Sequence, residues 1–415
     1  MHVVIIGGGI VGCSSAWFLN QEGHQVTVLD TGEVLPNCSH GNAGYVCPSH
    51  FIPLATPGIV QQGLRWMLNR ESPFYIQPRL NLDLIRWGWH FMRSANENRV
   101  SKAAIPLRDI ALYSQSLYEQ WSSLPEFRFG YEKKGLLEIF QTDAVAKHAA
   151  DTCEKACEIG LTGTRLIGKE ELQEYEPHLQ FRALGAIWFP GDAHLYPQLL
   201  MEQLKSQLTS AGVQFIEEKA TGFQSNAQRL KSVLTAQHSY PADAVVLAAG
   251  SWSGELARQL DLSLPLVAGR GYSLTRSNED FQLQHPAILT EGRVALTPLE
   301  GGKLRIGGTM EIVPTNTPPN FNRMKGVLKA VKQFIPDKSI PFPDPKDIWY
   351  GYRPCSADGL PYIGRPGRWN NLVVATGHAM IGLSLGAGTG KLVADLIDHQ
   401  PTAIHLQAFH PDRFK

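Results

Sequence analysis

The stretch that decides the fold of this chain is Val3-Val4-Ile5-Ile6-Gly7-Gly8-Gly9-Ile10-Val11-Gly12. Its first four residues form a short apolar run, which predicts a buried strand. The residues from Ile10 to Leu19 have helical character, and Gly23 ends that helix. A second apolar run from Gln25 to Leu29 predicts another strand, so the chain starts with a predicted β-α-β unit.

The turn of this unit carries Gly7, Gly9 and Gly12 in the spacing G-x-G-x-x-G, and Asp30 ends the second strand. Such glycines allow a tight turn, the close approach of a pyrophosphate and close packing of the helix on the strand. The start of the helix offers amides and a positive dipole to the phosphates. A carboxylate at Asp30 accepts both ribose hydroxyls, which argues against NADP. The pattern predicts an adenine dinucleotide site and leaves NAD and FAD open.

The composition is that of a globular protein. Hydrophobic residues make up 43% and charged residues 18% of 415 residues, which suits two or three compact domains. Lys+Arg and Asp+Glu both number 38, so the formal net charge is zero. Without an overall positive field, we expect no nucleic-acid partner.

The cysteines and the N-terminus bear on the compartment. The 6 cysteines show no C-x-x-C pair and no zinc-like spacing, so we expect no metal site and a reducing environment. The first residues lack the pattern of a signal peptide, and no apolar stretch is long enough to span a membrane. These features predict a cytoplasmic protein, with the inner face of the cell membrane as an alternative location.

Further predicted strands lie far along the chain. Ala244 to Ala249 and Leu372 to Ala375 repeat the buried-strand signature and extend the parallel sheet. Other segments have different patterns: the helical ones run from Asp143 to Gly160 and from Pro197 to Ala211, and the short strands from Leu264 to Thr275, Arg293 to Thr297 and Lys303 to Thr309. We expect the short strands in a second, mainly antiparallel sheet. The first domain is then discontinuous, with the second inserted in it.

Several motifs resemble one known superfamily when they are taken in order along the chain. They are Gly7 to Asp30, Ser39-His40-Gly41-Asn42-Ala43-Gly44, Ala248-Ala249-Gly250-Ser251-Trp252, Gly351-Tyr352-Arg353-Pro354 through Asp358 to Gly364, and Thr376-Gly377-His378. The chain resembles the FAD-dependent D-amino acid oxidase/glycine oxidase superfamily, and within it the bacterial D-amino acid dehydrogenase small-subunit group. The resemblance covers nearly the whole chain.

The resemblance implies an α/β fold, in which a discontinuous Rossmann-type FAD-binding domain carries an inserted α+β substrate domain built on a mainly antiparallel sheet. We expect residues 1–60, 178–262 and 350–415 in the FAD-binding domain. Residues 61–177 and 263–349 then form the substrate domain. Pro336 to Pro345 is the clearest linker.

The resemblance also selects FAD as the cofactor. The residues expected to bind it are Gly7, Gly9, Ile10, Val11, Gly12, Asp30, Ser39, Asn42, Ala43, Gly44, Gly250, Trp252, Gly377, His378, Met380, Ile381 and Gly382. The segment from Thr376 to Gly382 is expected to open a helix whose amides face the flavin. Gly382, Gly386 and Gly390 would share one helix face, either to pack on the sheet or to approach FAD. His40 and Cys355 leave covalent attachment open.

Arg353 is the residue we expect to bind an amino acid substrate. A guanidinium stays charged and forms two parallel bonds to a carboxylate, and the resemblance gives this role to the arginine of the G-x-R-P segment. Arg270 is a second candidate, and Tyr272 beside it could add a hydroxyl. His50 and His194 are candidates for the substrate pocket, although a single histidine is more often structural.

The segment from Ile59 to Met92 mixes aromatic and basic residues, including Trp66, Arg70, Arg86 and Trp89. This pattern suits a helix in a membrane interface, which would favour a quinone as electron acceptor. The competing interpretation, in which helices of the substrate domain pack their aromatic residues inward, is the favoured one.

The leading functional hypothesis is an FAD-dependent dehydrogenase of D-amino acids, with D-proline or a hydroxy-D-proline among the candidate substrates. It would yield imino acids and then 2-oxo acids plus ammonia, and would pass electrons to an acceptor other than oxygen. One alternative is an oxidase of glycine or sarcosine that uses oxygen. A second is a flavin-dependent 2-hydroxy acid dehydrogenase, and a third is a dinucleotide-binding sensor without enzymatic activity.

Overall fold

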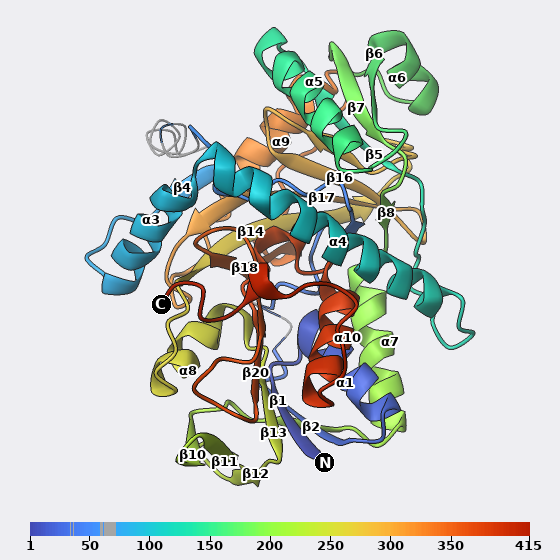
Figure 1. Ribbon diagram of the computed structural model, residues 1–415. Coiled ribbons are helices and arrows are strands. Elements are labelled where there is room, and N and C mark those ends of the chain that lie inside the picture. Colours follow the sequence, from blue (N-terminus) through green and yellow to red (C-terminus); the bar gives the residue numbers. More distant parts are fainter. Residues whose placement is uncertain (34, 36, 59–60, 62–71) are drawn as a thin grey trace.

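Two large β-sheets organise the chain, and each is assembled from strands that lie far apart in the sequence (Figure 1). The computed structural model describes residues 1–33, 35, 37–58, 61 and 72–415. The predicted segment from Ile59 to Met92 lies partly outside these residues, and Trp66 and Arg70 belong to the part that is outside.

The first sheet has the strand order β19-β20-β13-β1-β2-β9. Its strands are β1 (His2–Ile6), β2 (Gln25–Asp30), β9 (Gln214–Glu217), β13 (Ala244–Leu247), β19 (Tyr362–Gly364) and β20 (Leu372–Thr376). All neighbours are parallel except β19 and β20, and Ile5 aligns with Val28 on one side and Val246 on the other. The strands read as continuous apolar runs because both faces of the sheet are covered.

Alternate residues of β1 enter different hydrophobic clusters. Val3 and Ile5 pack with α1 (Ile10–Gln21), α7 (Pro197–Ser210) and α10 (Gly386–Ile397). Val4 and Ile6 instead face the side of α8 (Ser253–Gln259) and the small sheet of β10 (Gly222–Asn226), β11 (Arg229–Leu234) and β12 (Ser239–Pro241). Figure 1 shows α1, α7 and α10 side by side and α8 across the strands from them. This is the predicted Rossmann-type layering.

The glycines of the last helix serve packing on another helix. A side chain at Gly390 would overlap the Ser14 backbone of α1, and one at Gly386 would collide with Ile10. Gly388 lies against Ser114 of the long helix α4 (Glu97–Ser122). α10 does contact β19 and β20 of the sheet, but the glycines themselves allow α10 to approach α1 and α4. Gly382 precedes α10 and does not share its face.

The second sheet has the strand order β18-β14-β17-β16-β15-β5-β7-β6, and β4 pairs with β17. The strands are β4 (Phe74–Ile76), β5 (Leu136–Phe140), β6 (Arg165–Gly168), β7 (Gly185–Phe189), β14 (Leu266–Ser277), β15 (Ala287–Leu289), β16 (Val294–Leu299), β17 (Lys303–Ile312) and β18 (Ile348–Ser356). All pairs are antiparallel except β15 with β5 and β17 with β4. The predicted antiparallel sheet is therefore present. Its helices include α3 (Leu82–Ser94), α5 (Asp143–Glu158), α6 (Lys169–Tyr175) and α9 (Arg323–Phe334).

Strand membership differs from the predicted domain boundaries at two places. β7 pairs with β5 and β6 of the second sheet, although residues 178–262 were expected in the FAD-binding domain. β18 pairs with β14 over Ile348 to Ser356, so the boundary expected at residue 350 falls inside a strand of the second sheet. Short apolar strands of both sheets look alike in sequence, because the pairing partner and not the strand itself decides which sheet a strand joins. Arg353 consequently belongs to the second sheet.

Candidate active site

A cavity of about 490 Å³ begins at the carboxyl ends of the parallel strands and extends to the edge of the second sheet. Asp30 lines one part of it, and Tyr352 and Arg353 of β18 line another. Ligands of open α/β sheets bind at this end of the strands. The position of the cavity follows from the topology that the sequence predicted.

The glycine-rich turn shapes the dinucleotide end of the cavity. Gly7 has a φ of +108°, which only glycine adopts readily, and a side chain there would also meet the Ala248 carbonyl. A side chain at Gly12 would overlap the Gly7 carbonyl, so Gly12 lets α1 start close against β1. The Ser39 hydroxyl accepts from the amide of Ile10 at 3.0 Å and keeps its own proton free to donate.

Asp30 is held in place by backbone amides. Its carboxylate accepts from the amide of Gly8 at 2.6 Å and from that of Gly32 at 2.9 Å. Each oxygen retains a lone pair for another donor, so two adjacent hydroxyls of a ribose fit this group. The arrangement agrees with the role expected for Asp30.

The loop from Asn37 to Gly44 joins the two sheets. Within the loop, the Asn42 side chain accepts from the amide of Gly44 at 2.9 Å. From the second sheet, the Arg305 guanidinium donates to the carbonyls of His40 at 3.1 Å and Asn42 at 2.8 Å. Arg305 is 5% exposed, and burial lowers its pKa to about 10. The sequence interpretation missed this residue, although a lone arginine between the apolar residues of β17 was a signal.

Two further contacts hold the same loop against the second sheet. The Ser273 hydroxyl donates to the Gly41 carbonyl at 2.9 Å, and the Trp349 ring occupies the space beside Gly41. A side chain at Gly41 would overlap that ring. The loop that lines the dinucleotide cavity is therefore positioned by residues of β14, β17 and β18.

The segment after β20 differs from the expected helix start. The residues from Ala379 to Ile381 form a short 3₁₀ turn, and α10 begins only at Gly386. His378 lines the cavity, but its imidazole bonds to Thr389 of α10 at 3.0 Å. Burial lowers the pKa of His378 to about 3, so the ring is neutral. Because α10 does not start directly after Gly377, its dipole does not act at this part of the described cavity. The turn therefore offers only its backbone groups to a ligand.

Arg353, the residue expected to bind the substrate, lies in the wall of the cavity. Its Nη1 donates to the Thr309 carbonyl at 2.7 Å, which is its one hydrogen bond within the described part of the chain. Burial lowers its pKa, whereas the neighbouring thiols of Cys355 and Cys38 raise it. The remaining N–H groups have no partner among the described residues, so the guanidinium is available to an anion.

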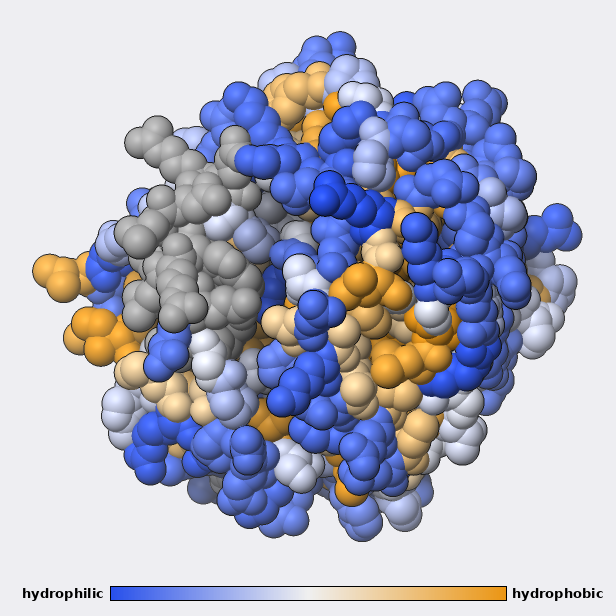
Figure 2. Space-filling view, turned by 90° about the horizontal axis from the view of Figure 1, so that it is seen from above, coloured by the Kyte–Doolittle hydropathy of each residue, from blue (hydrophilic) through white to orange (hydrophobic). Residues whose placement is uncertain are grey.

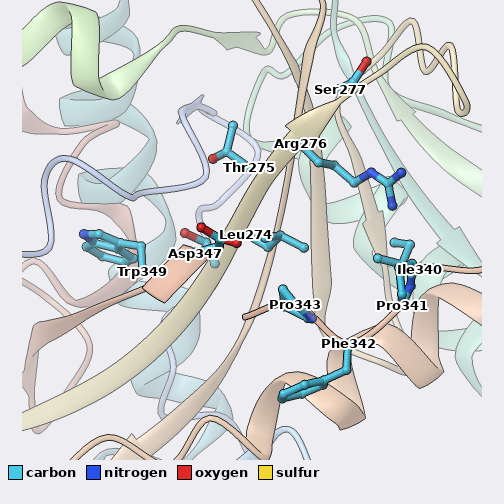
Figure 3. A pocket seen from close by; sticks show the side chains of 11 residues that line it. Leu274, Thr275, Arg276, Ser277, Ile340, Pro341, Phe342, Pro343, Asp347 and Trp349 are labelled. Atoms are coloured by element: carbon cyan, nitrogen blue, oxygen red, sulfur yellow. The ribbon is translucent and has the colours of Figure 1, made fainter. Parts of the chain in front are cut away.

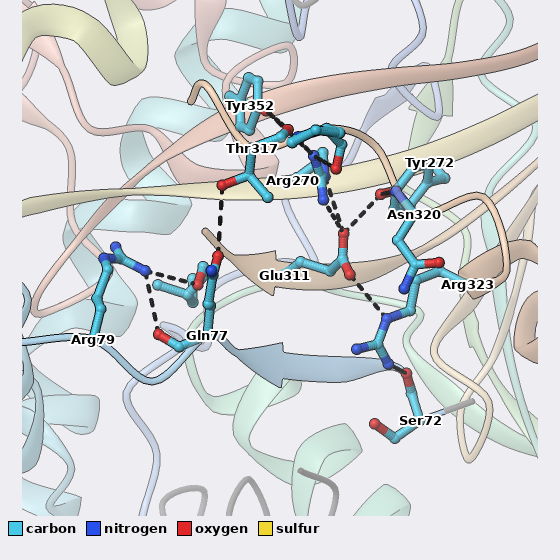
Figure 4. Close-up of polar contacts among 12 residues, drawn as sticks. Ser72, Gln77, Arg79, Arg270, Tyr272, Glu311, Thr317, Asn320, Arg323 and Tyr352 are labelled. Carbon is cyan, nitrogen blue, oxygen red and sulfur yellow. Dashed lines mark hydrogen bonds and ion pairs between the residues drawn. The ribbon is translucent and has the colours of Figure 1, made fainter. Parts of the chain in front are cut away.

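Arg270 and Tyr272 form a buried ionic network in a different place (Figure 4). Arg270 donates to Glu311 at 3.0 Å, and Arg323 donates to the other oxygen of Glu311 at 2.9 Å. The Tyr272 hydroxyl donates to Glu311 at 2.7 Å and accepts from the amide of Asn320 at 2.8 Å. Neither Arg270 nor Tyr272 lines the cavity. The expected substrate role of these two residues is therefore corrected: their polar groups are used within the fold.

The two candidate histidines also lie outside the cavity lining. His50 stacks on Tyr45 with ring centroids 6.1 Å apart, and burial lowers its pKa to about 4. Its Nδ1 is buried without a partner among the described residues. His194 is 2% exposed and pairs through its backbone with Glu132. Burial lowers the pKa of His194 to about 4 as well, so both rings are neutral near pH 7.

Two carboxyl groups in this region, the buried Asp192 and the half-buried Glu138, were missed by the sequence interpretation. Asp192 accepts from the Ser49 hydroxyl at 2.5 Å, and burial raises its pKa to about 7. Burial, and next the charge of Asp192, raises the pKa of Glu138 on β5 to about 7. No sequence motif connects these residues, since residues far apart in the chain meet here.

A second hollow, separate from this cavity, lies at the end of β14. It is an open groove of about 450 Å³ between the end of β14 and the proline-rich segment (Figure 3). Its lining includes Thr275, Arg276, Ile340, Pro343 and Trp349. The groove is open to solvent, whereas small-molecule sites are usually enclosed.

The residues predicted for the cofactor divide into two groups. Those that line the cavity are Gly7, Gly9, Ile10, Val11, Asp30, Ser39, Asn42, Gly250, Trp252, His378 and Gly382. Those that do not are Gly12, Ala43, Gly44, Gly377, Met380 and Ile381. Gly44 and Gly377 have φ values of +89° and +82°, so they shape the neighbouring turns, and Met380 is 46% exposed.

The parallel sheet, the glycine turn and Asp30 define a dinucleotide-binding protein of the Rossmann type. A family model described as FAD dependent oxidoreductase matches residues 2–396. The chain therefore belongs to this family of FAD-dependent oxidoreductases.

Two relatives of similar length are named D-amino acid dehydrogenase. The chain is 30% identical over 427 residues to a D-amino acid dehydrogenase of Neisseria meningitidis serogroup C / serotype 2a, with 100% of each chain covered. It is 31% identical over 406 residues to a D-amino acid dehydrogenase of Methylobacterium radiotolerans, with 96% of each covered.

Solved structures share the fold. Glycine oxidase from Geobacillus kaustophilus superposes with a TM-score of 0.79 at 23% identity, covering 100% of this chain and 98% of that one. L-Proline dehydrogenase from P. horikoshii gives a TM-score of 0.75 at 21% identity, covering 100% and 97%. At this identity the likeness concerns the fold.

FAD fits the residues that line the cavity. The glycine turn and the Ser39 hydroxyl suit a pyrophosphate, and Asp30 suits the adenosine ribose. Asn42 and Trp252 line the cavity and are placed to border the remainder of the cofactor. These residues would hold FAD between the two sheets, with Arg353 in the same cavity.

Proposed function

We propose that the protein is a D-amino acid dehydrogenase that oxidises its substrate at the Cα–N bond. The observation that carries the proposal is Arg353 in the wall of the dinucleotide cavity, whose guanidinium donates to one carbonyl within the described part of the chain. Support comes from relatives of similar length that are named D-amino acid dehydrogenase. D-Proline and hydroxy-D-proline are the cyclic substrates that we include in the proposal.

Arg353 would bind the α-carboxylate of the substrate. Its planar fork forms two parallel hydrogen bonds to a carboxylate, which fixes both the position and the direction of the Cα–H bond. FAD, when bound, supplies the acceptor for the Cα hydrogen as hydride. An acyclic substrate leaves as an imino acid, which water hydrolyses to a 2-oxo acid and ammonia, whereas D-proline or hydroxy-D-proline leaves as the cyclic imine.

No strong base is needed for this reaction once the substrate amine is neutral. Among the described residues, the cavity lining contains no histidine whose ring lacks a hydrogen-bond partner, since the His378 imidazole bonds to Thr389. The protein's part is therefore to bind the carboxylate, orient Cα and keep water from the reacting atoms. His50 and Tyr272 have no step in this scheme.

The first experiment is an anaerobic visible spectrum of the holoenzyme. D- and L-amino acids, D-proline, hydroxy-D-proline, glycine and sarcosine are added one at a time. We expect D-amino acids to bleach the flavin band and ammonia to form with acyclic substrates. Bleaching by L-amino acids alone would contradict the proposal.

The same preparation distinguishes the alternatives. Fast turnover with oxygen, measured as peroxide from glycine or sarcosine, would indicate an amine oxidase. Bleaching by 2-hydroxy acids without ammonia would indicate a hydroxy acid dehydrogenase. A purified protein without bound flavin would favour a dinucleotide sensor.

We propose further that the protein meets the inner face of the cell membrane, where a quinone takes the electrons. No helix among the described residues is long and apolar enough to cross a bilayer. The α3 region instead exposes an apolar stripe, made of Leu80, Leu82, Ile85, Trp89 and Met92. Figure 2 shows hydrophobic side chains at the left margin, on the side where Figure 1 places α3.

The opposite face of α3 is buried through Trp87 and Phe91, so the exposed stripe is not the side that packs on the protein. Arg86 and Arg93 flank the stripe, and the Arg93 guanidinium lies 4.5 Å from the Trp89 ring centre. Apolar residues beside arginines suit the boundary of an anionic bilayer.

Flotation with vesicles of phosphatidylglycerol and phosphatidylethanolamine tests this contact. We expect the wild type to float and the double variant Leu82→Asp/Ile85→Asp to remain at the bottom. Leu184→Asp changes a similarly exposed leucine elsewhere and serves as the control. A wild type that fails to float would contradict the membrane contact.

A further inference from the structure

Gly271 lies in β14 directly against the guanidinium of Arg353. The three atoms nearest to a methyl group built on Gly271 are the guanidinium carbon and both terminal nitrogens of Arg353, and the methyl group would overlap them. Across the strands, Gly271 pairs with Gly351, and Arg353 pairs with Gly269. The Arg353 side chain therefore crosses β14 diagonally and fills the space that a side chain at position 271 would occupy.

The backbone at Gly271 gives no other reason for a glycine. Its φ lies outside the left-handed region, in contrast to those of Gly7, Gly44 and Gly377. An alanine would adopt the same backbone without strain. A glycine inside a strand often marks a close approach by another group, and here that group is Arg353.

Thr309 supports the same guanidinium from the side. Its carbonyl accepts from Arg353 Nη1 at 2.7 Å, and its φ is +65°, which is rare for a β-branched residue. The pairing of β14 with β17 shifts register between Arg270 and Tyr272, opposite this point. The irregular backbone at Thr309 thus directs a carbonyl at Arg353. Backbone strain of this kind is maintained where the surrounding structure imposes it, often at functional sites.

We propose that Gly271 is a positioning residue for Arg353, and that Gly271 and the Thr309 carbonyl together hold the guanidinium flat so that its free N–H groups face the substrate carboxylate. This inference rests on the proposed function for the identity of the ligand. The inference adds that Gly271, through Arg353, determines where the carboxylate lies relative to the cofactor. A shift of the guanidinium by the width of one methyl group would misplace that carboxylate.

The test measures binding of propionate, an unreactive carboxylate without an amine, by the change it causes in the flavin absorbance of the holoenzyme. We expect Gly271→Ala to weaken propionate binding at least tenfold at unchanged flavin content. In the background of Arg353→Lys, which removes the planar group, the same change should weaken binding less than twofold. Gly88→Ala makes the same substitution where a methyl group meets nothing within 4 Å, and it should have no effect.

Each outcome decides the inference. Wild-type affinity in Gly271→Ala, or an equal loss in the Arg353→Lys background, would overturn it, as would a wild type that does not bind propionate. If Gly271→Ala fails to fold, folding of the double variant would support the inference, and failure of both would overturn it. Propionate binding without reduction by any D-amino acid would contradict the proposed function alone.

Discussion

Single residues give the cavity two chemically different ends. Asp30 provides a carboxylate that is fixed by the amides of Gly8 and Gly32. Arg353 provides a guanidinium with one carbonyl partner. The first suits the hydroxyls of a ribose and the second suits a carboxylate, so cofactor binding and substrate binding should respond to different substitutions.

Arg353→Ala removes the proposed carboxylate contact. We expect KM for the substrate to rise at least tenfold, because a charge-assisted bond pair contributes on the order of 2–3 kcal/mol, while flavin content stays unchanged. Steady-state kinetics with an artificial acceptor measure the effect. Arg368→Ala, which removes an exposed arginine, is the control. Unchanged kinetics would remove Arg353 from the mechanism.

Asp30→Ala acts on the cofactor end. We expect FAD retention to fall roughly tenfold or more through loss of hydrogen bonds to a charged acceptor, whereas KM of the fully loaded fraction should stay near the wild-type value. Fluorescence titration of the apoprotein with FAD gives the dissociation constant. Asp151→Ala, at an exposed position of α5, is the matched control. Unaltered FAD affinity would speak against the ribose role.

Among the secondary-structure elements, the second sheet acts on the cofactor loop. β14, β17 and β18 provide Ser273, Arg305 and Trp349, and all three contact the segment from His40 to Asn42. The loop from Asn37 to Gly44 contains no helix or strand, so its conformation depends on these contacts with the second sheet. An element assigned to the substrate domain therefore shapes the dinucleotide site.

Arg305→Met tests this dependence. The side chain keeps an apolar body of similar length but leaves the carbonyls of His40 and Asn42 without their donor. We expect a loss of about 2 kcal/mol in the free energy of unfolding and weaker FAD retention. Denaturation of the apoprotein and FAD titration measure the two effects. Lys303→Met changes an exposed cation of the same strand and should affect neither.

For the whole molecule, the site exists only where two discontinuous sheets meet. β1 and β2 from the start of the chain, β13 from the middle and β20 from the end form the floor of the cavity, and β18 closes it. Near this junction, Glu138 of the second sheet and Asp192 lie close enough to raise the pKa of Glu138 in addition to the effect of burial. Burial of these carboxyls links the stability of the molecule to pH.

Burial raises the pKa of Glu138 from 4.5 to about 7 and that of Asp192 from 3.8 to about 7. The folded protein therefore holds protons that the unfolded chain releases at lower pH. The free energy of unfolding should fall as pH rises from about 4 to 7 and stay low above it. Glu138→Gln should reduce this fall by on the order of 1–2 kcal/mol.

Urea denaturation at pH 5, 6, 7 and 8 checks the expected dependence. Glu154→Gln at an exposed position of α5 should retain the wild-type dependence on pH. A Glu138→Gln variant that loses as much stability as the wild type between pH 5 and pH 8 would contradict the assignment of the effect to this residue.

The sequence by itself determined the β-α-β unit, the glycine turn, Asp30, the strands β13 and β20 of the first sheet, and the strands β14, β16 and β17 of the second. These features depend on neighbours in the chain: apolar runs fold as buried strands, and a turn with a φ of +108° needs glycine at position 7. The choice of Arg353 rested on the resemblance and on its Gly-x-Arg-Pro context, and the structure places it in the cavity wall.

Only the tertiary structure decided which polar residues face the cavity. Arg270 and Arg353 both lie in glycine-containing strands, but β14 turns Arg270 toward Glu311, and β18 turns Arg353 toward the cavity. Tyr272 follows Arg270 to the same side. Side chains alternate between the faces of a strand, so the face that meets the cofactor depends on pairing and register with distant strands. For the same physical reason, the sequence did not reveal the contacts of Arg305, the surroundings of Glu138 or the role of Gly271.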